Sequence, residues 1–449
     1  MLRRSGLFCL LLAAAPAAAQ TPADDPPPVK ELPGAGRAVD QEAYAARRAR
    51  LAERVGKGVV IIPAGQRQDL ERLVLQDNDF RQDDYFFYLT GLETPGAWLM
   101  VVATDGAVES TTLYLPRVNP MMMRWTGVQL GPGEEAARLT GISQVEEATP
   151  EVLEQALAAE DAPLFTTRWA GTEGNRLIEG WEQNGKEFAD VVPALDSLRQ
   201  VKDSLGLAAL RRAITITAEG ASAGMRAAHP GMWEYQLEAT IEYTFRNLGA
   251  DRVGFPSIVG SGPNSTTLHY DISRRRMEEG DLVVVDIGAE YAMYTADVTR
   301  TFPVSGRFTE RQRGIYELVL ETQNAIIEAI RPGVTLQELT VIGRSHMAEH
   351  SGDLCGEADC TRYFIHGVSH WLGMRVHDVG DGRRPLEPGM VLTVEPGIYI
   401  PEENVGVRIE DDVLVTEEGC EVLSIGAPKT VEDIERTMRS DDKRTGTRE

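Results

Sequence analysis

Four carboxylates and one histidine in the last third of the chain lie within apolar, β-branched stretches. They are Asp286, Asp297, His370, Glu395 and Glu410. Asp286 follows the apolar residues 282–285, so its carboxylate should be buried, at a cost on the order of several kcal/mol if it stays charged and alone. Two divalent cations would balance the four negative charges, and one imidazole would complete a ligand shell. These residues therefore predict a dinuclear metal site.

The spacing of the two aspartates predicts an antiparallel hairpin. Asp286 and Asp297 lie symmetrically about residues 291–292, so a turn there would place them directly opposite each other. Their Cβ atoms would then be about 4.5–5.5 Å apart. The alternative is that the acids lie on solvated strand faces, which suits an isolated acid but not one inside an apolar run.

The two glutamates have the same arrangement. Glu395 and Glu410 flank residues 402–403, which follow the turn-prone Pro401. Two opposed carboxylate pairs and a histidine could hold two cations about 3.5–4 Å apart. Carboxylates with one imidazole suit Mn²⁺, Zn²⁺, Fe²⁺ or Co²⁺, and the oxygen-rich donor set favours manganese.

The ligand order Asp, Asp, His, Glu, Glu resembles that of the pita-bread metallopeptidases, which include methionine aminopeptidase, prolidase, aminopeptidase P and creatinase. Residues 286–303 and 366–380 are most similar to the proline-specific branch, and residues 80–91 resemble its N-terminal creatinase-like domain. The resemblance covers most of the chain. It implies an α+β protein: an N-terminal creatinase-like α/β domain, then a pita-bread domain with a curved, mostly antiparallel sheet.

The resemblance also implies a role for each metal ligand. Asp286 would chelate one ion, Asp297 and Glu410 would bridge both, and His370 and Glu395 would complete the other shell. A water between two such ions would ionise near neutral pH and attack the scissile peptide carbonyl.

Further residues match positions around the substrate in this family. His269 resembles a substrate-site histidine, His366 would lie near the residue after the cleaved bond, and His377 would donate to the tetrahedral oxyanion. Glu395 would pass a proton to the leaving nitrogen. Arg408 lies two residues before the last ligand, so it should share its sheet face and help to position it.

The activity that the resemblance implies is removal of the N-terminal residue ahead of proline, from peptides with proline in the second position. Residues 366–373 and 81–91 look most like bacterial aminopeptidase P, which acts on tripeptides and longer chains. A prolidase restricted to dipeptides is the alternative. Creatinase-type chemistry is disfavoured because that branch departs from this ligand set. A non-catalytic peptide-binding relative is disfavoured because all five ligands are present.

The resemblance further implies a homo-oligomer, a dimer or tetramer, with a neighbour's N-terminal domain shaping the site.

The net charge of the chain and its N-terminal residues indicate where the protein is located and which partners it lacks. The 449-residue chain has a formal net charge of −24, which argues against nucleic acid or an anionic membrane as partner. Residues 1–19 have the basic start, short apolar core and small terminal residues of a cleavable signal peptide. The apolar stretch, residues 7–19, is too short to span the ~30 Å of a bilayer core. We therefore expect a secreted or periplasmic protein without a stable membrane anchor.

The remaining chain divides into four predicted segments. These are a flexible leader (20–40), an N-terminal domain (41–193), a catalytic domain (194–435) and a charged tail (436–449).

Cys355 and Cys360 enclose four residues of a polar loop and would pair in an oxidising compartment. The alternative is that these two cysteines and Cys420 are all reduced, and the cysteine count leaves both open.

Overall fold

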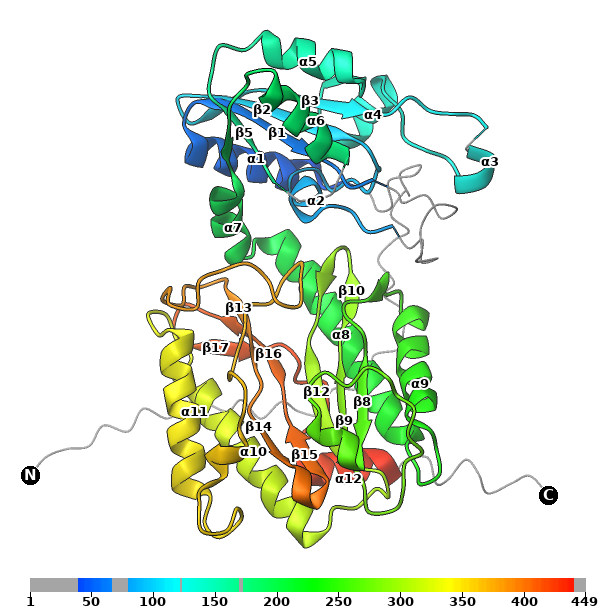
Figure 1. The fold of residues 1–449 in the computed structure, drawn as a ribbon, viewed down its shortest axis with the longest axis vertical. Helices are drawn as coiled ribbons and strands as arrows, with labels where there is room; N and C mark the ends of the chain where they lie inside the picture. Colours follow the sequence, from blue (N-terminus) through cyan, green and yellow to red (C-terminus); the bar gives the residue numbers. More distant parts are fainter. Residues whose placement is uncertain (1–38, 67–79, 122, 169–172, 440–449) are drawn as a thin grey trace, which may run out of the picture.

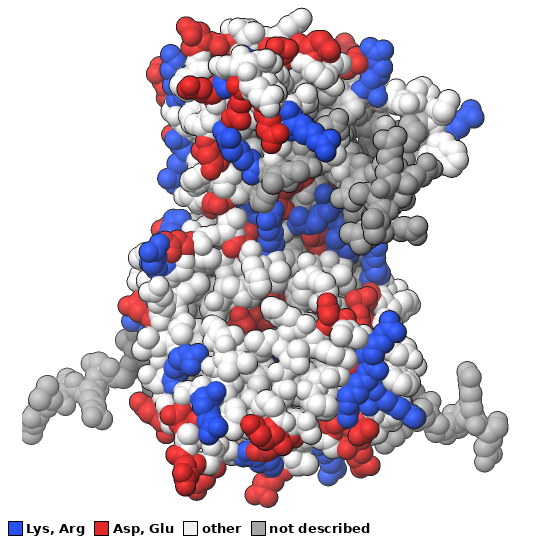
Figure 2. Space-filling view, viewed as in Figure 1, with Lys and Arg blue, Asp and Glu red and all other residues white. Residues whose placement is uncertain are grey.

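The computed structural model describes residues 39–66, 80–121, 123–168 and 173–439. The predicted signal peptide, and the leader up to residue 38, lie outside these ranges. The described chain is α+β, as predicted, with an N-terminal part above a larger C-terminal part in Figure 1. None of the helices in these ranges is long and apolar enough to cross a membrane. Acidic and basic side chains are interspersed over the face shown in Figure 2.

The N-terminal part is built on a six-stranded mixed sheet in the order β4-β3-β2-β1-β5-β6. Its strands are β1 (Gly58–Pro63), β2 (Trp98–Thr104), β3 (Ala107–Leu115), β4 (Gln144–Glu147), β5 (Leu164–Thr166) and β6 (Phe188–Asp190). Its helices are α1 (Gln41–Val55), α2 (Asp84–Thr90), α3 (Met123–Thr126), α4 (Glu134–Thr140), α5 (Pro150–Ala158) and α6 (Glu173–Gln183). The side chain of Asp40 caps α1 by accepting from the backbone of Ala43, so the helix begins at Gln41.

The C-terminal part has short antiparallel sheets with four long helices around them (Figure 1). The helices are α8 (Ser204–Ala227), α9 (Glu234–Asn247), α10 (Glu310–Ala329) and α11 (Leu336–His350). Thr309 and Thr335 begin α10 and α11 with capping boxes, which explains the sharp starts. The strands are β7 (Arg252–Val253), β8 (Ile258–Ser261), β9 (Leu282–Ile287), β10 (Ala289–Tyr291), β11 (Tyr294–Thr295), β12 (Val298–Pro303), β13 (Val391–Val394), β14 (Gly397–Ile400), β15 (Val405–Arg408), β16 (Asp411–Val415) and β17 (Cys420–Val422).

The register of the first predicted hairpin was wrong. Asp286 pairs with Thr299, not with Asp297. The reason is the turn, which lies at Ala292 and Met293, both with positive φ (51° and 67°), one residue later than expected. The later turn shifts the pairing by two residues. Because side chains alternate along a strand, an even shift keeps both aspartates on one face, as diagonal rather than direct neighbours.

The register of the second hairpin is confirmed. Val394 pairs with Asp411, and Gly397 pairs with Arg408. Both pairings place Glu395 opposite Glu410. The loop between β14 and β15 ends at Asn404, whose left-handed φ of 55° closes the turn.

Helix α7 (Val192–Gln200) connects the two parts, and partly buried ion pairs join them. Arg47 of α1 contacts Asp203 at 2.7 Å, and Arg81 contacts Glu290 at 2.6 Å. At the other end of the chain, α12 (Val431–Arg439) continues past residue 436, where we expected the charged tail to begin.

Candidate metal centre

All nine residues that the sequence singled out line one cavity of about 210 Å³ in the C-terminal part. They are Asp286, Asp297, His370, Glu395, Glu410, His269, His366, His377 and Arg408, and Leu268 completes the lining. Asp286 lies on β9, and the other acids lie where one strand ends and the next begins. Segments that are up to about 140 residues apart in sequence therefore converge on a single space.

The centre of the cavity is His370. Its Nε2 lies 3.3 Å from Asp297 Oδ2, 3.6 Å from Glu395 Oε1 and 3.8 Å from Glu410 Oε1. Its Nδ1 lies 3.1 Å from the carbonyl of Trp371, which can only accept, so Nδ1 carries the proton and Nε2 has a lone pair. Acceptor atoms spaced this closely match neighbouring ligands around an ion held at about 2.1 Å.

The acids also have oxygens that lack a protein partner. Among the described residues, Asp286 Oδ1, Asp297 Oδ1 and Glu410 Oε1 are buried without a hydrogen bond. Donor atoms of Asp297, His370 and Glu410 all lie within 4.8 Å of one another. Buried carboxylate oxygens are normally satisfied, so this donor set fits a bound cation.

The pKa values of the acids also indicate a site for cations. Burial and the charge of Asp286 raise the pKa of Asp297 well above its usual value. Burial and the charge of Asp297 do the same to the pKa of Glu410. Burial also raises the pKa of Glu395 to about 7. Three acids that resist ionisation in one cavity are stabilised as carboxylates once divalent cations bind among them.

Arg408 contacts a different carboxylate from the one we expected. Its Nη2 lies 2.8 Å from Asp286 Oδ2. Within the part of the chain that the structure describes, Arg408 makes no direct hydrogen bond to Glu410. Instead, its Nε donates to the hydroxyl of Thr299, which donates to Glu410 Oε2 at 2.7 Å. Arg408 therefore orients one carboxylate directly and the other through Thr299.

His366 is held by a directed chain of hydrogen bonds. Arg408 donates to the hydroxyl of Tyr399, so that hydroxyl donates to His366 Nε2, at 2.8 Å. His366 Nδ1 then donates to the carbonyl of Gly367 and lies 3.5 Å from Glu395 Oε2. Burial and the charge of Arg408 lower the pKa of His366 to about 4, so its imidazole is neutral at physiological pH.

His377 lies edge-on to His370, with ring centroids 4.4 Å apart. Burial and the neighbouring His370 lower its pKa, so it is a neutral donor near pH 7. An adjoining cavity of about 270 Å³ shares His269, Asp286, Asp297 and His377 with the first. Its other lining residues are mostly apolar: Phe255, Pro256, Ile258, Asp271 and Val376. The cavity that holds the candidate ligands thus opens beside an apolar wall.

The loop carrying His269 is anchored by a fully buried carboxylate. Glu234 accepts from the backbone nitrogens of Ser261 and Arg275 and from the hydroxyl of Tyr270. These contacts hold the chain on both sides of His269 in one conformation.

Two family models match the chain. Aminopeptidase P, N-terminal domain, matches residues 44–165, and Metallopeptidase family M24 matches residues 208–417. The Xaa-Pro aminopeptidase of Haemophilus influenzae is 36% identical over 80% of this chain and 88% of its own length. The chain belongs to metallopeptidase family M24. It is therefore a hydrolase of the metallo-exopeptidase class.

Two further comparisons bear on this M24 peptidase. The solved structure of Escherichia coli aminopeptidase P with the inhibitor Pro-Leu superimposes with a TM-score of 0.82 at 33% identity, covering 89% of this chain and 98% of that one. The Xaa-Pro dipeptidase of Homo sapiens is 30% identical over 89% of this chain and 94% of its own. The expected resemblance and the α+β fold are both confirmed.

Some contacting residues escaped the sequence analysis of this peptidase. Tyr399 lies two positions after Gly397, on the face that Glu395 occupies, so strand alternation could have found it. Thr299 and Asp412 could have been found less easily. Thr299 bonds Glu410 across strands, and Asp412 Oδ2 accepts from the backbone nitrogen of Asp297. Such contacts depend on which strands lie side by side.

The raised pKa of Glu395, a candidate ligand, predicts that metal binding depends on pH. A ligating carboxylate must be ionised, so each group that is protonated in the metal-free enzyme loses its proton as the metal binds. With a pKa of about 7, Glu395 alone should strengthen metal affinity roughly tenfold between about pH 6 and pH 8. Competition with a chelator at several pH values measures this, and an affinity independent of pH would contradict it.

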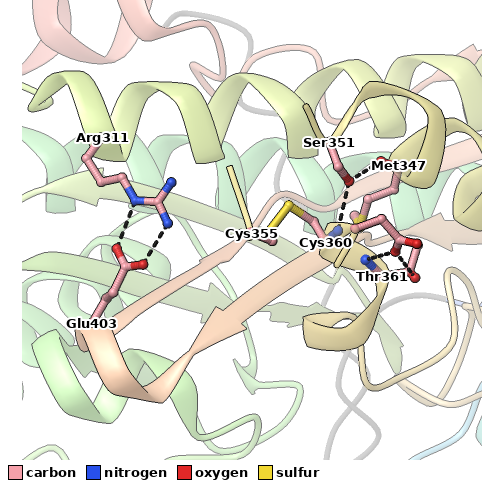
Figure 3. Close-up of a disulfide and its surroundings, with 8 residues drawn as sticks. Arg311, Met347, Ser351, Cys355, Cys360, Thr361 and Glu403 are labelled. Carbon is pink, nitrogen blue, oxygen red and sulfur yellow. Dashed lines mark hydrogen bonds and ion pairs between the residues drawn. A yellow bond between two sulfur atoms is a disulfide. The ribbon is translucent and has the colours of Figure 1, made fainter. Parts of the chain in front are cut away.

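The cysteine pair forms a disulfide in the loop that follows α11. Cys355 and Cys360 are bonded, and Figure 3 shows the bridge beside Ser351, whose hydroxyl accepts from the backbone nitrogen of Cys360 at 2.8 Å. Figure 3 also shows Arg311 paired with Glu403 at the tip of the β14–β15 hairpin. Cys420 is outside the disulfide, and its thiol donates to the carbonyl of Ile327.

This bonding pattern gives a definite thiol count. In the protein produced without residues 1–19, and so without Cys9, alkylation after purification under oxidising conditions and denaturation without reductant should label Cys420 alone. After reduction it should also label Cys355 and Cys360. Mass spectrometry of the alkylated peptides provides the measurement. Labelling of all three before reduction would mean that the protein matures with reduced thiols.

Proposed function

We propose that this chain is an exported dinuclear-metal aminopeptidase that hydrolyses the Xaa-Pro bond at the N-terminus of tripeptides and longer peptides. One observation carries the proposal: the five candidate metal ligands, three of which have an unpartnered buried oxygen, share a cavity with three further histidines. The Xaa-Pro aminopeptidase named among the relatives supports the choice of bond.

The proposed metal ligands are Asp286, Asp297, His370, Glu395 and Glu410, and Mn²⁺ is the proposed ion because four of the five side chains offer oxygen. When bound, the metal pair supplies a water of lowered pKa as nucleophile and polarises the scissile carbonyl. The chain positions these groups before substrate arrives, through Thr299, Arg408 and the Trp371 carbonyl.

The histidines are proposed to act on the substrate. His377, neutral and at the edge of His370, donates to the oxygen that becomes negative during attack. His366, kept neutral and oriented by Tyr399, lies beside Glu395 and contacts the residue after the cleaved bond. Glu395 takes a proton from the attacking water and passes it to the leaving nitrogen of proline. His269, held in its loop by Glu234, orients the substrate next to the apolar wall.

Export and oligomerisation complete the proposal. The signal-peptide features of residues 1–19 and the Cys355–Cys360 disulfide both fit an oxidising compartment.

A homo-oligomer is supported by the segment around α3, which projects from the N-terminal part in Figure 1. Its apolar side chains are Met121, Trp125 and Val128, which are 71%, 81% and 54% exposed. Such a patch fits contact with a second copy.

The choice of substrate length can be tested directly. The mature enzyme, loaded with Mn²⁺, should cleave Gly-Pro-Leu and a longer Xaa-Pro peptide faster than the dipeptide Gly-Pro at equal concentration. Prolidase activity is the second candidate, favoured by the 30% identity to the human dipeptidase. Cleavage of the dipeptide alone would establish it and overturn our preference. No turnover of any of the three with Mn²⁺, Zn²⁺ or Co²⁺ would overturn the peptidase proposal itself.

A further inference from the structure

Two histidines away from the catalytic cavity are stacked on the surface of α11. His346 and His350 are four residues apart, a spacing that places side chains next to each other on one helix face. Their ring centroids are 4.1 Å apart and the ring planes differ by 16°. His350 is exposed and His346 is partly exposed, and neither lines the cavity described above.

The hydrogen bonds of this pair select the tautomer that binds metal. His350 Nδ1 lies 2.8 Å from the backbone carbonyl of His346, which can only accept, so Nδ1 carries the proton. His346 Nδ1 lies 3.4 Å from the hydroxyl oxygen of Thr322, whose own proton is donated to the carbonyl of Leu318. That oxygen can therefore only accept from His346. Both Nε2 atoms are left with lone pairs, the arrangement found in metal-ligating histidines.

We propose that His346 and His350 form a surface site for a divalent first-row transition metal such as Zn²⁺, Ni²⁺ or Cu²⁺, bound through the two Nε2 atoms. Two nitrogens held about 2.1 Å from one ion are about 3 Å apart. Because each lone pair lies in its ring plane, the two rings would turn out of the observed stack so that both Nε2 atoms point at the same ion. Water and a nearby carboxylate would fill the remaining positions.

The surroundings favour a cation. Glu321 and Glu328 of α10 and Glu349 of α11 all act electrostatically on His346. Burial and the neighbouring His350 lower the pKa of His346, which keeps its ring neutral and able to ligate. Imidazole donors bind Cu²⁺, Ni²⁺ and Zn²⁺ far better than Mn²⁺, in contrast to the carboxylate-rich catalytic cavity. The two sites should thus be occupied by different ions.

Retention on an immobilised Ni²⁺ column tests the proposed site, because the column binds only exposed side chains. The protein is applied untagged and loaded with Mn²⁺. The parent protein should be retained, and His346→Gln and His350→Gln should each elute early. His229→Gln, a change at an exposed histidine elsewhere on the protein, should behave like the parent. Equal retention of all four proteins, or weaker retention of the His229 variant alone, would overturn the proposal.

Binding in solution provides a second measurement. Titration with Zn²⁺ alone should detect one more equivalent per chain for the parent and for His229→Gln than for His346→Gln or His350→Gln. The catalytic cavity is the same in all four proteins, so any exchange of Mn²⁺ there cancels in the comparison. An equal stoichiometry throughout would show that the stacked pair does not bind the ion. Peptidase activity of the variants shows that each is folded.

Discussion

Replacing Asp297 with alanine should abolish peptidase activity and remove bound metal. Asp297 is buried, lies 3.3 Å from His370 Nε2 and has an unpartnered oxygen, so the change removes a donor from the centre of the cavity. Loss of a residue that merely supports a ligand costs about 10- to 100-fold in metal affinity or activity, and loss of a ligand itself should exceed that. Glu410→Ala should have the same two effects. Elemental analysis and peptide hydrolysis, performed on the same preparations, measure both.

Two control variants separate ligation from general damage. Asp353→Ala, at an exposed acid, should keep both metal and activity. His366→Ala should keep the metal but slow turnover, because His366 is hydrogen-bonded to Tyr399 and is not one of the proposed ligands. Equal metal loss in Asp297→Ala, Glu410→Ala and His366→Ala would contradict the proposed division of roles.

Replacing His377 with alanine should lower kcat by about 100- to 1000-fold with little change in bound metal, the loss expected when one oxyanion donor is removed. His377 lies beside His370, is neutral near pH 7 and opens onto both cavities. KM should change much less than kcat, because the donor acts mainly in the transition state.

A conservative variant sharpens this second prediction. His377→Gln retains a side-chain donor and should recover part of the lost kcat. Metal content, measured for both variants, should match that of the parent. If His377→Ala lost its metal, or if kcat were unchanged, His377 would be a structural neighbour of His370 and not a catalytic donor.

The sequence predicted the five candidate metal ligands from residue type and apolar flanking residues, and the three further histidines from the family resemblance. Apolar residues on both sides of Asp286 and Glu395 indicated buried carboxylates, and charge balance indicated metal. The second hairpin was also predictable, since Glu395 and Glu410 are symmetric about a loop that starts at Pro401 and ends in the left-handed Asn404.

The first hairpin was not predictable in the same way. Its turn uses Ala292 and Met293 at positive φ, although such turns usually contain glycine or asparagine. The sequence therefore had no turn signal at these residues, and the register was misplaced by two. The prediction that both aspartates face the cavity survived because a shift of two residues preserves the face.

Only the tertiary structure decided how the side chains are paired. Arg408 contacts Asp286, on a strand more than 120 residues earlier in the chain, and reaches Glu410 only through Thr299. The Cys355–Cys360 bond, which the sequence left open, was likewise settled by the folded loop. The type of a residue and its sequence neighbours indicate which side chains are buried and which are charged. Their partners are set by which distant strands lie side by side, because hydrogen bonds and ion pairs act over about 3 Å in space and not along the chain.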